Sequence, residues 1–352
     1  MAVMLDQILR AGRELAASDI HLVRGVAPAF RVHGDIRLAR LEPLTDDALH
    51  TLLAELLSEK QRAVLEDQRQ LCFSRYWKGI GRFRASIYFH GGVPEMAIRV
   101  SENTVRPREE LRLPTVIDEL TRKPTGLILI TGPTGVGKTT TLNYMVDLIN
   151  RERRCKIITI EDPVEFTHEN RSSIVIQQEV HTDTPSFGRA LVHVLRQDPD
   201  VIAVGEMRDL ETIGTALTAA ETGHLVLATL HTPDAVQTIQ RIYGAFPPGQ
   251  QNNIIYQLSN SLQAIVAQNL LPRADGKGQV LACEICVATP AIRKMIRDGE
   301  SHLMVNEIQM GKKFQMQTMD MALVDLYQRG EISYDTAMSC VRDPTQFRKQ
   351  TG

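Results

Sequence analysis

This sequence of 352 residues has no hydrophobic run that approaches the length of a membrane-spanning helix, and it has almost no net charge. Its 40 Lys and Arg residues nearly balance its 42 Asp and Glu residues, so no general electrostatic attraction to nucleic acid is expected. The first residues, Met1 to Asp6, lack the pattern of a signal peptide. We therefore expect a cytoplasmic protein with no nucleic acid as its main partner.

Cysteine is also scarce. The five cysteines are odd in number and scattered, which fits a reducing compartment better than a disulfide framework. Cys283 and Cys286 form a C-x-x-C pair, but no second pair follows to complete a four-ligand zinc site. Residues 280–285 also read as a buried strand, in which Cys packs as a small apolar residue. This pattern favours core packing for the pair, with a metal site as the alternative.

A glycine-rich phosphate-binding loop is the most informative feature that is present. Its G-x-x-x-x-G-K-[ST] pattern comprises Gly132, Pro133, Thr134, Gly135, Val136, Gly137, Lys138 and Thr139. An apolar strand at 127–130 leads into it, and a helix from about Lys138 to Asn150 follows, whose amino end favours anions. Lys138 should reach the β- and γ-phosphates of ATP, and the Thr139 hydroxyl should bind Mg²⁺. The sequence therefore predicts a nucleoside triphosphate site.

Two carboxylates follow predicted strands in the positions where a parallel sheet delivers its loops to a nucleotide. Glu161 ends the run at 156–160, and we expect it to polarise the attacking water. Glu206 follows the apolar strand at 200–204 in the place of a Walker B carboxylate. We expect it to act on Mg²⁺ through a water. The alternative for each is a solvated loop carboxylate.

Two histidines and two arginines complete the candidate site. His224 and His231 flank the apolar strand at 225–229, and His231 could sense the γ-phosphate, although a lone histidine is usually structural. Arg84 and Arg99 lie on alternating strands of the first part of the chain. Such arginines are ordinarily solvated, but a planar guanidinium also suits phosphate oxygens, as in an arginine finger.

The pattern of the chain changes near residue 114. Before it, helices at 4–17 and 45–57 and strands at 18–22, 29–33, 81–89 and 95–100 predict a small α+β domain over residues 1–105. Residues 106–113 are charged and contain Pro107, which suits a linker. Residues 114–352 alternate apolar runs with helices, which is typical of a parallel α/β sheet, and become mostly helical after Pro247. The further strands are expected at 127–131 and 174–177.

Set in order, these blocks resemble the secretion-superfamily hexameric ATPases of type IV pilus systems, and within them the PilT retraction, or twitching-motility, ATPases. The matching blocks are Ala17–Leu22, Gly81–Arg84 with Ile98 and Arg99 at the family's arginine fingers, Glu161–Glu165 as the Asp box, Asp198–Asp209 as the Walker B block, and Thr222–His224 through His231–Thr232 as the His box. The resemblance covers essentially the whole chain and is far more specific than the phosphate loop alone.

The resemblance implies a PAS-like first domain, a RecA-like second domain and a homohexameric ring that binds ATP and Mg²⁺. It implies nucleotide between the two domains and work on the inner-membrane platform protein of the pilus machine, with the ATPase attached peripherally to that membrane. Residues 291–298 resemble the C-terminal AIRNLIRE segment of retraction ATPases, with changes at Lys294, Met295 and Asp298. Core packing of Ile292, Met295 and Ile296 on one helical face is the alternative for this segment.

Other functions stay open at this stage. An assembly or secretion ATPase would share the core but lack the segment at 291–298, and such enzymes carry an additional N-terminal domain and a paired C-x-x-C insertion that this sequence does not have. A ring that binds ATP without turnover is disfavoured by the intact Lys138, Glu161 and Glu206. A ring that translocates nucleic acid is disfavoured by the near-neutral charge.

Overall fold

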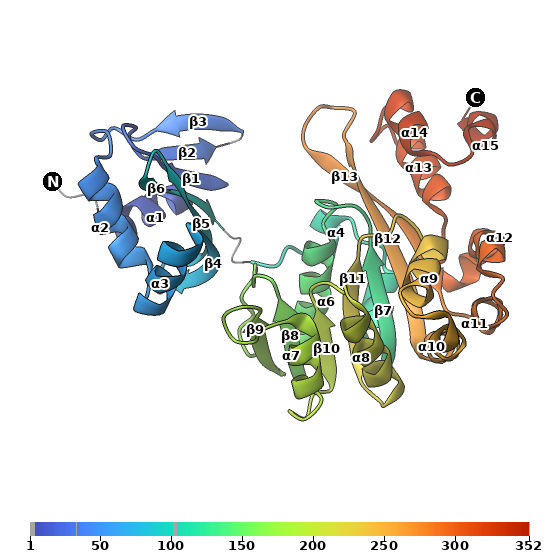
Figure 1. The fold of residues 1–352 in the computed structure, drawn as a ribbon. Coiled ribbons are helices and arrows are strands. Elements are labelled where there is room, and N and C mark those ends of the chain that lie inside the picture. Colours follow the sequence, from blue (N-terminus) through green and yellow to red (C-terminus); the bar gives the residue numbers. More distant parts are fainter. Residues whose placement is uncertain (1–3, 33, 101–103, 352) are drawn as a thin grey trace. The chain divides into compact units, whose positions relative to one another are not determined.

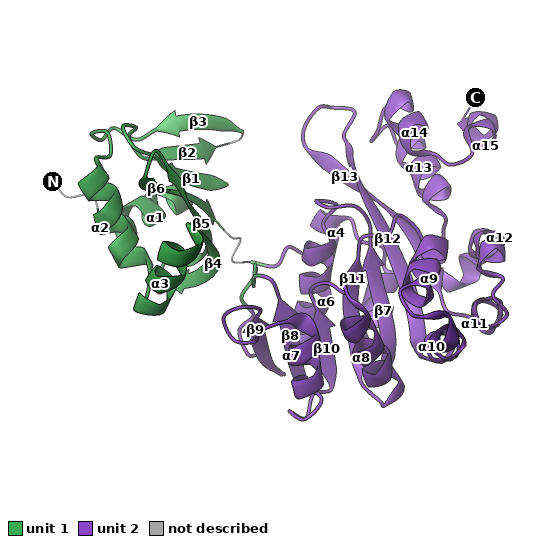
Figure 2. Cartoon of the chain, viewed as in Figure 1, with its two compact units in different colours: residues 1–104, 163–167 green, residues 105–162, 168–352 purple. Residues whose placement is uncertain are grey.

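The computed structural model describes residues 4–32, 34–100 and 104–351. The chain forms two compact units (Figure 2), of which unit 1 holds residues 1–104 and 163–167 and unit 2 holds residues 105–162 and 168–352. Residues 163–165 of the Asp-box segment belong to unit 1, which the sequence patterns do not predict. His33 and residues 101–103, which the predicted strand and connecting segment include, lie outside the described residues.

Unit 1 is an antiparallel sheet with helices packed on one face. The sheet order is β3-β2-β1-β6-β5-β4 (Figure 1). Its strands are β1 (Asp19–Leu22), β2 (Ala29–Val32), β3 (Asp35–Leu38), β4 (Gln70–Trp77), β5 (Gly81–His90) and β6 (Val93–Val100), and its helices are α1 (Leu5–Glu14), α2 (Asp46–Leu56) and α3 (Glu59–Gln68). The predicted helix from residue 45 is confirmed, because the Thr45 hydroxyl accepts a hydrogen bond from the Ala48 N–H at 3.2 Å as its amino-terminal cap. The sequence patterns do not predict β3, β4 or α3.

Successive side chains along each strand point to opposite faces of this sheet, and the two faces differ in character. On β5, Phe83, Ala85 and Ile87 are buried in the core with the helices. Arg84 lies between them in sequence and therefore on the opposite face. The strand pairing aligns Arg31, Asp19, Arg99, Arg84 and Ser74 as one row across five strands. The face away from the helices is thus polar and rich in arginine.

Unit 2 is built on a seven-stranded sheet of order β13-β12-β7-β11-β10-β8-β9, in which only the β12–β13 pair among the described residues is antiparallel. The strands are β7 (Gly126–Thr131), β8 (Lys156–Glu161), β9 (Ile174–Glu179), β10 (Val201–Val204), β11 (Leu225–Leu230), β12 (Leu262–Pro272) and β13 (Gln279–Val287). The central strands β7, β10 and β11 are buried along their whole length, which explains their continuous apolar sequence.

Helices cover this sheet and form the carboxyl-terminal part of the unit (Figure 1). They are α4 (Arg108–Leu111), α5 (Val116–Thr121), α6 (Lys138–Glu152), α7 (Phe187–Val194), α8 (Leu210–Glu221), α9 (Ala235–Gly244), α10 (Pro248–Ser261), α11 (Pro290–Arg297), α12 (Met304–Met310), α13 (Met319–Gln328), α14 (Tyr334–Cys340) and α15 (Pro344–Thr351), with 3-10 turns at Ser301–Leu303 and Lys312–Phe314. Among the helices of the described chain, none is long and apolar enough to cross a bilayer.

The predicted fold class, a small α+β domain followed by a P-loop α/β domain, is confirmed. The region after Pro247, predicted to be mostly helical, also contains the long strand β12, which its sequence pattern does not reveal. Cys283 and Cys286 lie in β13 and are both buried, and burial raises the pKa of each thiol. Core packing is therefore correct for the C-x-x-C pair, and the described residues contain no group of three His, Cys, Asp or Glu side chains that could hold a metal.

Candidate nucleotide-binding site

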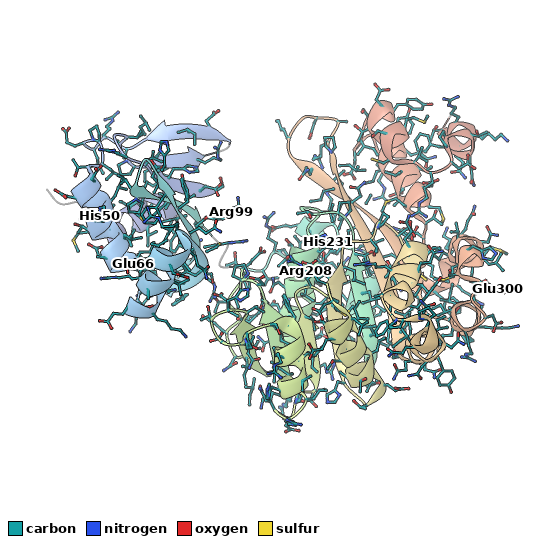
Figure 3. The ribbon with its side chains drawn as sticks, in the orientation of Figure 1. His50, Glu66, Arg99, Arg208, His231 and Glu300 are labelled. Carbon is teal, nitrogen blue, oxygen red and sulfur yellow. The ribbon has the colours of Figure 1, made fainter. Side chains whose placement is uncertain are left out.

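The parallel strand order brings the candidate residues of unit 2 to one edge of the sheet. The loop after β7, Glu161 at the end of β8, Glu206 after β10 and His231 after β11 all follow the carboxyl ends of neighbouring strands. Figure 3 labels Arg208 and His231 at this edge. In open α/β sheets this edge is where ligands bind.

The phosphate loop adopts a conformation that only glycine accommodates at its start. Gly132 has a φ of +139°, and a Cβ there would lie 2.4 Å from the carbonyl oxygen of Gln268 on β12. Gly137, at the amino-terminal cap of α6, has a φ of +85°. No side chain of the described residues caps α6, so the first-turn N–H groups have no partner within the helix. Uncapped N–H groups beside a tight glycine loop form a cradle for phosphate oxygens.

Lys138 folds back over the loop. Its Nζ donates to the carbonyl oxygens of Gly132 at 2.8 Å and Pro133 at 2.7 Å, and it lies 3.3 Å from Nδ1 of His231. Burial lowers the pKa of Lys138, and the nearby charge of Glu206 opposes that shift. The ammonium group is thus held at the loop, where a phosphate oxygen can replace the carbonyl contacts.

Glu206 and His231 form a bridge between the ends of β10 and β11. The Nε2 atom of His231 lies 3.0 Å from Oε1 of Glu206, and Nη2 of Arg208 lies 2.7 Å from Oε2. Partial burial raises the pKa of Glu206, but the contacts with Arg208 and His231 together outweigh it, and the net shift is downward. A neutral His231 with its proton on Nε2 satisfies both contacts, because Nδ1 then accepts from Lys138.

Glu161 is almost fully buried at the end of β8, with 5% of its surface exposed. Its Oε1 atom accepts from the Thr159 hydroxyl at 2.6 Å and from Nε2 of Gln177 at 3.0 Å. A solvated loop carboxylate is therefore the wrong description of this residue. The sequence patterns do not identify Gln177, because its contact depends on the pairing of β8 with the edge strand β9.

The structure brings His231, but not His224, to the phosphate loop. Because β11 runs parallel to β7, His224 lies before the strand at the opposite edge of the sheet. Its Nδ1 atom is 3.0 Å from the carbonyl oxygen of Ala219 and 3.3 Å from the Thr222 hydroxyl. These contacts close the carboxyl end of α8, so His224 lies away from the phosphate loop of its own chain.

The two candidate arginine fingers belong to unit 1. Arg84 and Arg99 are paired directly across β5 and β6. Nε of Arg99 lies 3.0 Å from Oδ1 of Asp19, and Nε of Arg84 donates to Sγ of Cys72 at 3.4 Å. Figure 3 shows Arg99 on the unit 1 sheet.

A separate cavity of about 590 Å³ lies in unit 2 beside α4, α13 and β13. Its arginines are matched by carboxylates, since Arg112 pairs with Glu331 and Arg329 lies 3.0 Å from Asp325. This balance of charge gives the cavity no preference for phosphate, whereas the loop at 132–139 offers N–H groups and an ammonium.

The fold and this site define a P-loop nucleotide-binding protein. The family model described as "Type II/IV secretion system protein" matches residues 109–320. The chain therefore belongs to that family.

The chain is similar to its relatives from end to end. It is 42% identical to "Type IV pilus retractation ATPase PilT" of Pseudomonas aeruginosa over 97% of this chain and 99% of that protein. It is also 42% identical to "Twitching motility protein" of Neisseria gonorrhoeae over 96% of this chain and 90% of that protein. A solved structure of "the Pilus Retraction Motor PilT and Bound ADP" matches with a TM-score of 0.92 and 44% identity over 99% of each chain. The predicted resemblance to retraction ATPases is confirmed.

Proposed function

We propose that this chain is a Mg²⁺-dependent ATP hydrolase that powers the retraction of type IV pili as a homohexameric ring. The observation that carries the proposal is the convergence of Lys138, Glu161, Glu206 and His231 at one sheet edge, in a chain that matches a retraction motor over 99% of its length. The adenine nucleotide is supported by the ADP bound in that relative.

Each site residue has a separate role in phosphoryl transfer. The N–H groups of the loop and Lys138 hold the phosphates, which positions the γ-phosphate for in-line attack. Glu161 accepts a proton from the attacking water as general base. His231, bonded to both Lys138 and Glu206, moves when these groups engage a γ-phosphate and so reports its presence.

The residues present fit Mg²⁺ that arrives with the nucleotide. Mg²⁺ is commonly held by substrate phosphates, water and only one or two protein oxygens. The Thr139 hydroxyl in the first turn of α6 and the carboxylate of Glu206 would supply these oxygens, the latter through a water because Arg208 and His231 occupy it. The ion would neutralise charge on the phosphates.

Arg84 and Arg99 would supply positive charge from unit 1. They are paired directly across β5 and β6 in a polar row on the face that carries no helices. In this proposal the two residues serve as arginine fingers on the phosphates of bound ATP in the hexameric ring. The arginines then act on the charge of the transition state.

Work on an inner-membrane platform protein is the proposed output, with the ring at the cytoplasmic face of the membrane. In the segment at 291–298, Ile292 and Ile296 are buried, and Nη1 of Arg293 donates to Ser259 and Asn260 carbonyls at the end of α10. Core packing of Ile292 and Ile296 therefore accounts for one face of α11. Lys294 and Asp298, where the segment departs from the retraction pattern, are exposed.

Deletion of the gene in its host tests the cellular function. We expect piliated cells that cannot twitch, with recovery on expression of the wild-type chain but not of Lys138→Ala. Loss of pili in the deletion strain would contradict retraction and indicate an assembly ATPase.

A further inference from the structure

A line of buried and partly buried polar contacts joins Glu161 to the helix of the phosphate loop. Oε1 of Glu161 receives two hydrogen bonds, one from Thr159 on its own strand and one from Gln177 on the neighbouring strand. The first partner is fixed by the local sequence, two residues before Glu161. The second comes from β9, the edge strand of the sheet.

The orientation of the Gln177 amide is determined at both ends. In the register of β8 and β9, Gln177 stands opposite Thr159, on the side of the strands that leads to Glu161. Its Oε1 atom accepts from the backbone N–H of His168 at 2.8 Å. Because a backbone N–H can only donate, the amide oxygen must face His168 and the NH₂ group must face Glu161. The side chain therefore delivers a donor to the carboxylate in one defined orientation.

The line continues to the phosphate loop. The Nε2 atom of His168 lies 2.9 Å from Oδ1 of Asn143, and Nδ2 of Asn143 donates to the carbonyl oxygen of Thr139 at 3.0 Å. His168 and Asn143 are both buried, with 8% and 7% of their surfaces exposed. Glu161 and the first turn of α6 are thus held against the same set of side chains.

We propose that Gln177 is a positioning residue that orients the Glu161 carboxylate toward the attacking water. The inference rests on the proposed role of Glu161 as general base. Two donors on Oε1 fix the plane of the carboxylate and stabilise its charged form. A general base must lie within hydrogen-bond reach of the proton that it accepts, so rotation of an unrestrained carboxylate reduces turnover without reducing ATP binding.

If Gln177 had a purely structural role, a different hydrogen bond would matter. In that case the important bond is the one from the His168 N–H, which tethers the middle of the segment between β8 and β9. Gln177→Glu separates the two roles, since it keeps an oxygen for His168 and replaces the donor to Glu161 with a second carboxylate. Gln177→Met has a similar length and removes both hydrogen bonds. Gln178→Met makes the same change one residue along, on the opposite side of β9.

The experiment measures kcat, ATP affinity and the pH dependence of kcat on the full chain with Mg²⁺, for these three variants and Glu161→Gln. We expect Gln177→Met and Gln177→Glu to lower kcat roughly tenfold or more and to leave ATP affinity unchanged. A loss of this size is expected when one hydrogen bond to a charged group is removed. The acidic limb of the profile in Gln177→Met should move to higher pH, because the charged form of the base has lost a donor. Gln178→Met should match the wild type.

Two results would overturn the inference in distinguishable ways. If Glu161→Gln is inactive but Gln177→Glu retains wild-type kcat and pH dependence, Gln177 is a structural tether and Glu161 keeps its role. If Glu161→Gln itself turns over normally, the assignment of the base is wrong and the positioning role of Gln177 is lost with it.

Discussion

His231 Nε2 lies 3.0 Å from Oε1 of Glu206, while Nδ1 of the same ring lies 3.3 Å from Nζ of Lys138. One side chain therefore contacts both the phosphate-binding lysine and the carboxylate at the end of the adjacent strand. A γ-phosphate that draws Lys138 away from the loop carbonyls would change the contact at Nδ1 of this ring. We propose that His231 responds to nucleotide state through this contact.

The first prediction concerns His231, which contacts both Lys138 and Glu206. His231→Ala should lower kcat for ATP roughly tenfold or more while ADP affinity changes little, because the ring acts where the γ-phosphate is recognised. Steady-state turnover and ADP titration measure the two quantities. His193→Ala, an exposed histidine on α7, is the control and should behave as the wild type. Equal losses of ADP affinity and turnover would mean that His231 only supports the loop.

The second prediction concerns the unit 1 arginines. Arg84→Ala or Arg99→Ala should lower turnover more than nucleotide binding, because charge supplied to the transition state does not contribute equally to the ground state. Arg31→Ala changes the same residue type in the same cross-strand row, two strands from Arg99, and should have a smaller effect. Parallel losses of binding and turnover, or no loss in either variant, would count against the finger role.

The third prediction is a pH dependence of stability. Burial lowers the pKa of His168 to about 4. Between pH 6.5 and about 4 the unfolded chain binds a proton at His168 that the folded chain does not, so stability is lost as pH falls through this window. The loss amounts to roughly 3 kcal/mol at most. Denaturant unfolding across this range should show a smaller loss for His168→Gln, and identical pH dependences would contradict the assignment.

The fourth prediction concerns a charge cluster in which the exposed Arg342 faces two buried carboxylates. Arg342 lies 2.9 Å from Oδ2 of Asp234 and 3.7 Å from Oε2 of Glu284, and both carboxylates are almost fully buried. Burial raises the pKa of Glu284, which shows the cost of this environment to a charge. Arg342→Ala should destabilise the chain by roughly 2 kcal/mol in denaturant unfolding. Arg348→Ala, an exposed arginine on α15, is the control, and equal stabilities would contradict the cluster's contribution.

The parts of the site that could be predicted are those encoded in contiguous stretches. The phosphate loop combines a short motif with an apolar strand before it, and Glu161 and Glu206 end strands that are buried on both faces. These features follow from local patterns because a central parallel strand must be continuously apolar. The strand order then places their carboxyl ends together.

The parts that could not be predicted depend on pairing between distant segments. The bond from Gln177 to Glu161 needs the register of the edge strand β9, whose alternation of polar and apolar residues does not specify its neighbour. Asn143 and His168 meet only after α6 packs on the sheet. His224 and His231 flank the same strand and look equivalent in sequence, but the direction of β11 separates them to opposite edges.

The most direct test of the account is ATP turnover by Glu161→Gln, measured with ATP binding on the same preparation. We expect ATP binding close to that of the wild type and turnover lowered roughly a hundredfold or more, as for loss of a general base. Glu169→Gln, an exposed carboxylate in the following loop, should retain turnover. Turnover by Glu161→Gln at the wild-type rate would contradict the account, because the buried carboxylate at the end of β8 would then not be the group that activates water.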